Sequence, residues 1–364
     1  AGMGGAAADG GDGRAGAGQA GEAEDLVSRS GDRWSAAYTA REFEGVRRTL
    51  DGEYVGVGIS VRRERDPQGA PAVAVARVQP GSPAADAGIR RGDRLREIDG
   101  TRVADHPVTD VVARLRGSGT GSGSGTDERS SRAAAHSSGP GSAVGLALSR
   151  DGRQWKETLH RARLTADAVT VDRMGDGTTR IKVASFSKGS AQQVRAAVAG
   201  GHSGILLDLR GNSGGLVSEA VKAASAFLEG GLVATYDENG SQRALYADSR
   251  AGAGAGAGAG GTSARPLVVL VDGGTMSAAE MLTGALQDRG RAVVVGSRTF
   301  GKGSVQVPRK LPDGSVAELT VGHYATPAGR SLDGEGISPD LSVDAPREAA
   351  ERARTVLGGL EPRS

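Results

Sequence analysis

Two short stretches of the sequence carry residues that could act together on a substrate. Ser277 lies in "TMSAAE", and Lys302 lies between two glycines in "TFGKGSVQ". Only six of the 45 basic residues are lysines, so cationic positions in this chain are usually arginines. Arg keeps its proton in a protein, whereas burial can neutralise Lys, so a lysine kept here indicates chemistry; the alternative is an ordinary surface lysine. A buried, neutral lysine can take the proton of a serine hydroxyl that attacks a carbonyl group.

Ser277 has two interpretations, which the sequence leaves open. The residue follows an apolar run that ends at Val271 and precedes a predicted helix, "AAEMLTGALQD". Backbone N–H groups at a helix start can hold an oxyanion, which favours a nucleophile at this turn. "SAAE" is also a capping box, in which the serine hydroxyl only caps the helix. A Ser-His-Asp triad has weak support, because no motif joins Ser277 to any of the five histidines, His106, His136, His160, His202 and His323.

The surrounding pattern predicts the fold that must position these residues. From Leu164 onward, near-continuous apolar runs such as "GILLDLRG" and "PLVVLVDGG" alternate with amphipathic stretches such as "SAAEMLTGALQDRG". Strands that are apolar on both faces and alternate with helices are typical of a parallel sheet covered on two sides. We therefore predict a mixed α/β protein with a mostly parallel α/β core.

A second, β-rich segment precedes this core. "GVGI" at residues 56–59 places Gly56 and Gly58 around Val57 and before Ile59. Glycines here allow backbone N–H groups to face inward and form a nest for a peptide carboxylate; the alternative is a simple β-bulge. In the helix "SPAADAG", Ser82 is the predicted N-cap, Pro83 the first turn and Gly88 the stop.

Longer motifs in the same order resemble a known family. In "GVGI" and "VQPGSPAADAGIRRGDRLREIDGTRV" (78–103) the β-rich segment resembles a PDZ domain. "LDLRGNSGG" (207–215), "MSAAE" (276–280), "ALQDRGRAVVVGSRTFGKGSVQ" (285–306) and "LPDGSVAELTVGHYATPAGRSLDGEGISPD" (311–340) are similar to C-terminal processing, or tail-specific, peptidases. These are Ser/Lys serine proteases that carry a PDZ domain, and the resemblance covers residues 24–345.

The resemblance implies a set of site residues. Ser277 matches the nucleophile, Lys302 the general base and Gln306 the residue that positions the lysine. The backbone N–H groups of Gly215 and Ala278 match the oxyanion hole, and a glycine at 215 would let the backbone approach a carbonyl closely. In a regular strand Lys302 and Gln306 would lie about 13 Å apart, so we expect the chain to bend at the glycines. Residues 56–59 match the peptide-binding loop of the PDZ domain.

Composition and motifs give the following domain boundaries. Residues 1–24 are expected to be a disordered low-complexity N-terminus, followed by a helical segment at 25–52. The PDZ domain spans 53–162, with a Gly/Ser-rich insertion at about 117–142. The protease core spans 163–345 with a low-complexity loop at 250–263, and a C-terminal helix or tail follows at 346–364.

Several other classes of function are disfavoured. A net charge of +2 with mixed signs offers no basic stripe for nucleic acid, and the absence of Cys excludes thiol chemistry. "RGNSGG" follows a strand but lacks the GK[ST] of a phosphate loop, and no His/Asp/Glu cluster has metal-ligand spacing, so no cofactor or metal is implied. No apolar run is long enough to span a membrane. The chain begins with Ala rather than Met, so a lost N-terminal signal or anchor remains open.

We therefore predict a serine endopeptidase whose partners are protein or peptide substrates with accessible C-termini. The alternative is a catalytically inactive PDZ-containing scaffold of the same fold, which would be expected to have lost Ser277, Lys302 or Gln306. By resemblance to bacterial members we expect an extracytoplasmic location, secreted or associated with the cell envelope.

Overall fold

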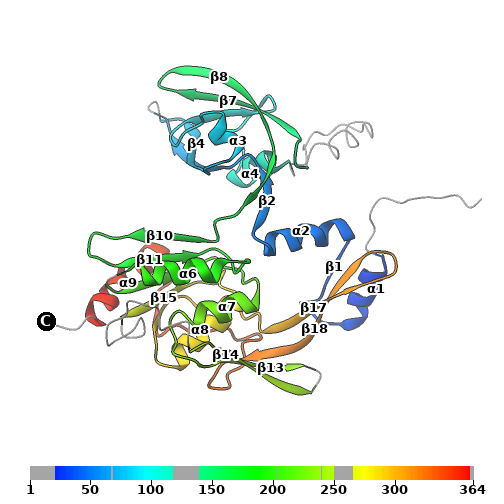
Figure 1. Ribbon diagram of the computed structural model, residues 1–364, viewed down its shortest axis with the longest axis vertical. Helices are drawn as coiled ribbons and strands as arrows, with labels where there is room; N and C mark the ends of the chain where they lie inside the picture. The colour runs from blue at the N-terminus through cyan, green and yellow to red at the C-terminus, as the bar shows by residue number, and fades with distance from the viewer. Residues whose placement is uncertain are drawn as a thin grey trace, which may run out of the picture. The chain divides into compact units, whose positions relative to one another are not determined.

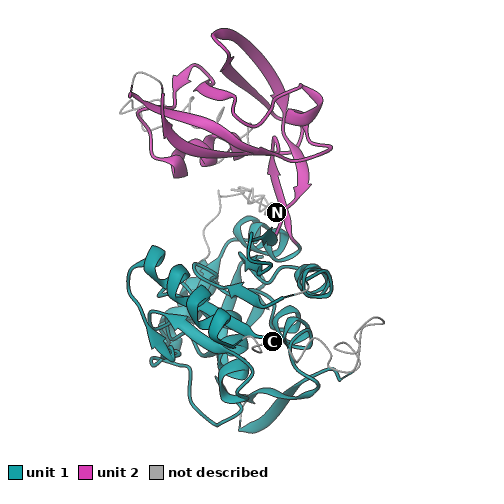
Figure 2. Ribbon diagram, turned by 90° about the vertical axis from the view of Figure 1, so that its left-hand side faces the viewer, with its two compact units in different colours: residues 1–51, 168–364 teal, residues 52–167 magenta. Residues whose placement is uncertain are grey.

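The computed structural model describes residues 21–66, 69–117, 139–201, 203–238, 240–249 and 265–360. The chain divides into two compact units, coloured separately in Figure 2. Unit 1 comprises residues 1–51 and 168–364, and unit 2 comprises residues 52–167. The β-rich segment is thus an insertion within the α/β segment of the chain.

The centre of unit 1 is a six-stranded sheet. Every neighbouring pair is parallel except the first, in which the edge strand runs antiparallel to its neighbour. This arrangement confirms the mostly parallel α/β core predicted from the apolar strands. In spatial order the strands are β10 (Val169–Arg173), β11 (Thr179–Val183), β12 (Ile205–Asp208), β15 (Leu267–Val271), β16 (Val293–Gly296) and β19 (Leu341–Ser342).

Helices cover both faces of this sheet (Figure 1). Leu207 and Val269 belong to the core shared with α6 (Ser190–Ala199), α7 (Val217–Ala224) and α8 (Ala278–Asp288). Their neighbours Leu206 and Val268 pack instead with Leu357 of α9 (Pro346–Leu360). Successive side chains of a strand point to opposite faces, so a sheet covered on both sides needs apolar residues at every position.

A second, five-stranded sheet completes unit 1. The order is β1 (Ala36–Tyr38), β18 (Val316–Ala325), β13 (Gly231–Glu238) and β14 (Ser241–Ala247), and β17 (Ser304–Lys310) also pairs with β18. The N-terminal helices α1 (Gly21–Ser30) and α2 (Ala40–Leu50) lie before and after β1 in the chain, and α1 packs on β18. This sheet therefore joins the N-terminal segment to the strand that follows Lys302.

Unit 2 is built around its own sheet and its own apolar core. The strands, in spatial order, are β3 (Ile59–Arg65), β4 (Pro71–Val78), β5 (Arg94–Ile98), β7 (Ala143–Arg150) and β8 (Arg153–His160), with β6 (Thr101–Arg102) paired to β5. The helices are α3 (Pro83–Asp86) and α4 (Val108–Arg116). At the start of α3 the Ser82 hydroxyl accepts a hydrogen bond from the Ala85 N–H at 3.3 Å, which confirms the predicted N-cap.

The domain limits differ from expectation at two places. Helix α1 begins at Gly21, so residues 21–24 are helical, because Ala23 is buried against Ala317. Unit 2 extends beyond residue 162, because β9 (Ala162–Thr165) forms an antiparallel pair with β2 (Glu53–Gly56) at the other end of the insertion. Residues 1–20, most of the 117–142 insertion and the 250–263 loop lie outside the described residues.

Candidate active site

Ser277 stands at a sharp turn between strand β15 and helix α8. Its φ of 52° and ψ of −119° fall where non-glycine residues are rare, and α8 begins with the next residue. The turn is held by Asp272, whose Oδ1 accepts the N–H groups of Gly211 and Gly274 at 2.9 Å each. The strained backbone and its fixed surroundings match the strand–turn–helix position expected of a nucleophile.

The loop 210–215 packs directly against this turn. The Met276 N–H donates to the Asn212 carbonyl at 2.9 Å. A Cβ atom at Gly214, where φ is +98°, would lie 3.0 Å from the Ser277 Cβ and 3.2 Å from the Ala278 nitrogen. Only glycine permits this approach without displacing Ser277. We predicted a glycine requirement at Gly215 and missed Gly214, although both glycines end the same motif.

The two expected oxyanion donors are the residues that follow this contact in the chain, Gly215 after Gly214 and Ala278 after Ser277. A parallel bridge joins Phe186 to Gly215, but it uses the N–H groups of Phe186 and Leu216, at 2.8 and 2.7 Å, and leaves out that of Gly215. Ala278 is the first residue of α8, where a backbone N–H has no partner within the helix. Among the described residues neither N–H group has another acceptor, so both can donate to a carbonyl oxygen that acquires negative charge.

A single buried carboxylate connects Lys302 to Ser277. Oε2 of Glu280, whose residue is 0% exposed, accepts the backbone N–H of Ser277 at 2.9 Å and that of Lys302 at 2.9 Å. The two backbone nitrogens are therefore no farther apart than twice 2.9 Å. The Ser277 contact is the glutamate side of the predicted capping box. The chain reaches Lys302 through Gly301, at φ +90°, before β17 begins.

Lys302 is partly buried, less than we expected of a base kept neutral by its surroundings. Its Nζ lies over the ring of Trp34, 5.7 Å from the ring centroid. The Gln306 amide donates to the backbone carbonyl of Trp34, and within the described ranges no hydrogen bond joins Gln306 to Lys302. Trp34 thus contacts both residues, from a position 272 residues before Gln306, and sequence reasoning did not select it.

Asp208 is the last residue of β12, shortly before the loop 210–215. Its side chain is 0% exposed and accepts hydrogen bonds from Arg180 at 2.6 Å and from Arg210 at 2.8 and 2.9 Å. Burial alone would raise the pKa of Asp208, but the hydrogen bonds from Arg210 and Arg180 outweigh it and lower the pKa to about 2. The ionised carboxylate therefore fixes the first residues of "RGNSGG".

The expected peptide-binding loop of unit 2 is set by close packing. A Cβ at Gly58, where φ is +84°, would lie 2.2 Å from the Ser82 Cβ, so glycine is required there. The carbonyls of Val57 and Gly58 accept hydrogen bonds from Ala84 and Gln79, at 3.0 and 2.8 Å. The N–H groups of Val57 and Gly58 donate to no other described residue. Gly56 ends β2 and Ile59 begins β3.

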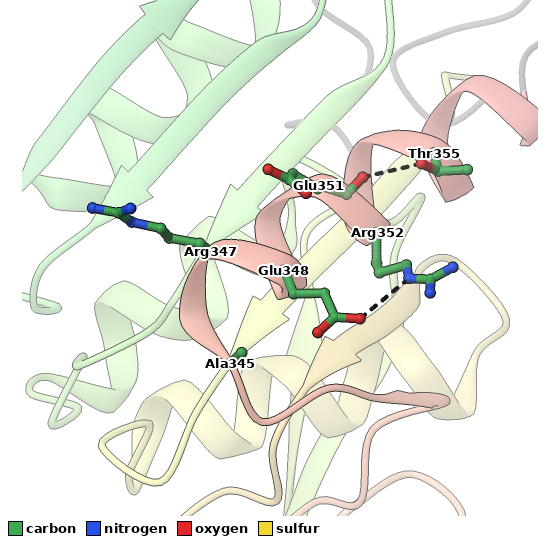
Figure 3. A pocket seen from close by; sticks show the side chains of 6 residues that line it. All are labelled: Ala345, Arg347, Glu348, Glu351, Arg352 and Thr355. Carbon is green, nitrogen blue, oxygen red and sulfur yellow. Dashed lines mark hydrogen bonds and ion pairs between the residues drawn. The ribbon is translucent and has the colours of Figure 1, made fainter.

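A surface pocket on helix α9 is unrelated to these residues. It is lined by Ala345, Arg347, Glu348, Glu351, Arg352 and Thr355 (Figure 3). Glu348 and Arg352 form an exposed ion pair at 3.6 Å, and no predicted site residue lines the pocket. The pocket therefore contributes nothing to the chemistry at Ser277.

Comparison with known proteins now gives the relationships of the chain. Residues 177–343 match the model of peptidase family S41, and residues 48–121 match the PDZ domain model. The first match contains Ser277, Lys302, Gln306 and Gly215, and the second contains residues 56–59. The resemblance expected from the motifs, to C-terminal processing peptidases with a PDZ domain, is confirmed.

Individual relatives agree with the family matches. The "Probable CtpA-like serine protease" of Staphylococcus aureus strain MW2 is 28% identical over 326 residues, which cover 88% of this chain and 59% of the relative. A homologue of the same name from Staphylococcus saprophyticus is also 28% identical, over 88% of this chain and 60% of its own length. The chain thus spans about three fifths of the length of these relatives.

One solved structure shows the same fold, and a second is similar in sequence. An S41 protein from Bacteroides fragilis superposes with a TM-score of 0.54 at 16% identity, over 91% of this chain and 87% of that one. The photosystem II D1 C-terminal processing protease is 28% identical, with a TM-score of 0.49, over 88% of this chain and 80% of that one. Among the described helices, none is both long and apolar enough to cross a membrane.

Proposed function

We propose that this protein is a serine endopeptidase in which Ser277 is the nucleophile and Lys302 the general base. The observation that carries the proposal is the shared contact with Glu280. The Glu280 carboxylate holds the backbone nitrogens of Ser277 and Lys302 within twice 2.9 Å of each other, although the two residues are 25 apart in sequence. The match of residues 177–343 to peptidase family S41 supports the same assignment.

In the proposed reaction Ser277 Oγ forms a bond to the carbonyl carbon of the substrate, and its proton passes to neutral Lys302 Nζ. The N–H groups of Gly215 and Ala278 donate to the oxyanion of the tetrahedral intermediate. The C–N bond then breaks, and the lysine returns the proton to the departing amine. Water attacks the resulting ester of Ser277 by the same sequence of proton transfers, which releases the acid and restores the serine.

Gln306 is proposed to position the Lys302 side chain during this cycle. Gln306 lies on β17, which begins two residues after Lys302, and its amide is hydrogen-bonded to Trp34. The Gln306 NH₂ group donates to Trp34, which leaves the amide oxygen as the acceptor through which Gln306 would hold Lys302 Nζ.

Unit 2 is proposed to bind the C-terminal residues of the substrate. The match of residues 48–121 to the PDZ model supports peptide binding, and the N–H groups of Val57 and Gly58, which donate to no other described residue, can donate to a carboxylate. An unfolded protein with a free C-terminus is therefore the proposed substrate. An extracytoplasmic location is part of the same proposal and rests on the family resemblance alone.

The test compares wild type, Ser277→Ala and Lys302→Arg on an unfolded protein, with and without a blocked C-terminus, by mass spectrometry of the fragments. Wild type should cleave, and both variants should lose at least about 10³-fold in kcat, because each removes a member of the reacting pair. Thermal unfolding of the variants should stay near that of wild type. Lys302→Arg keeps the charge but cannot act as a base, so wild-type-like cleavage by it would exclude Lys302 from that role.

The alternative function, a peptide-binding scaffold without catalysis, makes the opposite prediction. Such a protein would bind the unfolded substrate and leave it intact, with Ser277→Ala indistinguishable from wild type. The retention of Ser277, Lys302 and Gln306 together favours the peptidase.

A further inference from the structure

Glu280 makes more contacts around Ser277 than a helix cap requires. Its Oε2 accepts the N–H groups of Ser277 and Lys302, and its Oε1 accepts the N–H of Gly301 at 2.7 Å and the Thr299 hydroxyl at 2.5 Å. A capping carboxylate needs only the first of these bonds. The other three come from a loop 19 to 22 residues farther along the chain.

All four partners of Glu280 are hydrogen-bond donors, and each carboxylate oxygen receives two of them. Within the described ranges no Lys, Arg or His forms an ion pair with Glu280, so the polar contacts of its carboxylate there are these N–H and O–H groups. Burial at 0% exposure leaves no water to replace a lost bond, so each bond constrains the backbone firmly.

The loop that Glu280 holds is fixed at its other side too. The Thr299 hydroxyl, which donates to Glu280, accepts the Ile337 N–H at 2.7 Å, and the Phe300 N–H donates to the carbonyl of Thr275 at 3.0 Å. Residues 299–302 are thus held between the turn before Ser277 and the segment around Ile337. Of these contacts, only Glu280 touches both Ser277 and Lys302.

We infer that Glu280 is a positioning residue for the proposed reaction, one that sets the separation across which the serine proton moves to Lys302. This inference rests on the proposed function. The Glu280 side chain acts through the backbones of Ser277 and Lys302. Displacing reacting groups by about 1 Å can cost on the order of 10²-fold in rate, so the effect belongs in kcat rather than KM.

The chain offers a matched control on the same helix. Asp288, at the far end of α8, is also a buried carboxylate, with its side chain 6% exposed. It accepts the Ala328 N–H at 2.9 Å and pairs with Arg330, and it contacts neither Ser277 nor Lys302. Asp288→Ala therefore reproduces the loss of a buried carboxylate from α8 without disturbing the candidate site.

The experiment measures kcat and KM of the full chain on a short fluorogenic peptide for wild type, Glu280→Ala, Glu280→Gln and Asp288→Ala. Glu280→Ala should lower kcat about 100-fold with KM changed less than about 3-fold, while Asp288→Ala keeps a kcat near wild type. Glu280→Gln should fall between them. Its amide oxygen can still accept from Ser277 and Lys302 if the NH₂ group faces Gly301 and Thr299, which conflicts with the Gly301 N–H. Equal kcat values for Glu280→Ala and Asp288→Ala would overturn the inference.

A second readout does not depend on activity. Amide hydrogen exchange of the folded protein should accelerate at Ser277, Gly301 and Lys302 in Glu280→Ala, and should be unchanged there in Asp288→Ala. Unchanged exchange at these amides in Glu280→Ala would contradict the positioning role even if turnover fell. Turnover by Ser277→Ala, in contrast, would refute the proposed function. The exchange data would still test whether Glu280 holds the backbones of Ser277 and Lys302.

Discussion

The two units of this protein both bury charged side chains, but they use them for different purposes. In unit 1 the buried carboxylates of Asp208 and Glu280 bind the loops around Ser277. In unit 2 the buried guanidinium of Arg161 donates to the carbonyls of Arg114 and Leu115, at 2.9 Å each, where helix α4 ends. Elsewhere in unit 2 the buried Asp93 pairs with Arg150.

The buried charges of unit 1 position the candidate site, whereas those of unit 2 stabilise the fold. The four hydrogen bonds to Glu280 hold the loop 299–302 in one geometry, which apolar packing alone would define less tightly. Arg161 instead donates hydrogen bonds to carbonyls that the end of a helix leaves without partners. These bonds stabilise the fold of unit 2 and do not depend on a ligand. The loop 56–59 owes its shape to the close approach of Gly58 to Ser82. Substitutions near Ser277 should therefore change turnover, and those near residues 56–59 should change binding or stability.

Among the substitutions that test this comparison of the two units, the largest effect is expected from closing the gap at Gly214. Gly214→Ala places a Cβ 3.0 Å from the Ser277 Cβ and 3.2 Å from the Ala278 nitrogen, at a φ of +98° that strains any side chain. Ser277 and the oxyanion donor must then shift, so kcat on a short peptide should fall by at least about 10²-fold. Steady-state kinetics on the purified variant measure this.

Gly58→Ala is the counterpart of that substitution in unit 2. Its Cβ would meet the Ser82 Cβ at 2.2 Å, a closer conflict than at Gly214. The preference for a free over a blocked C-terminus should disappear, while hydrolysis of short peptides persists. If Gly58→Ala abolished short-peptide hydrolysis as Gly214→Ala does, the division between the two units would be wrong.

Much of this comparison was predictable from sequence, because it depends on local pattern. Apolar runs predicted the covered parallel sheet, and "SPAADAG" predicted the cap at Ser82. The motifs and the family that they resemble led to Ser277, Lys302 and Gly215, whose catalytic roles stay predictions until tested. Each of these inferences uses residues within one element or one motif, where chain geometry restricts the possibilities.

What could not be predicted depends on contacts across the chain. The spacing of Glu280 from Ser277 revealed a capping box, but its bonds to residues 299–302 exist only once α8 and the loop before β17 are packed together. Trp34 reaches Gln306 because β1 pairs with β18. No sequence pattern near Trp34 indicates this pairing. The helix at residues 21–24 was missed because a Gly/Ala-rich composition hides the burial of Ala23.

A third prediction concerns Asp208, whose charge holds Arg210 at the start of the loop 210–215. The pKa of Asp208 is lowered from 3.8 to about 2 in the folded chain. Because the folded-state pKa lies below the unfolded one, ionised Asp208 stabilises the fold above about pH 4, and this contribution is lost as the pH falls toward 2. The shift corresponds to about 2 kcal/mol at pH 7. Asp208→Asn should therefore lose at least about 2 kcal/mol of unfolding free energy at pH 7, where it leaves Arg180 and Arg210 without their carboxylate.

Urea unfolding at pH 7, 4 and 3 measures this difference. Wild type should lose stability between pH 4 and pH 3 more steeply than Asp208→Asn, because the variant lacks the group that takes up a proton. Parallel curves for the two proteins would show that Asp208 carries no charge-dependent stability. Turnover should fall in Asp208→Asn even at pH 7, since Arg210 begins the loop that ends at Gly215.

The smallest expected effect tests the claim that polar groups beside the loop 56–59 serve the fold. Ser82→Ala removes the N-cap of α3, a single hydrogen bond of 3.3 Å, and leaves a methyl group against Gly58. Loss of such a cap costs about 1 kcal/mol, so the unfolding of unit 2 should shift by that amount. Hydrolysis of a short peptide should not change, because the bond lies in unit 2 and Ser277 lies in unit 1. A fall in kcat comparable to that of Gly214→Ala, with unit 2 still folded by circular dichroism, would mean that the loop 56–59 acts on the chemistry itself.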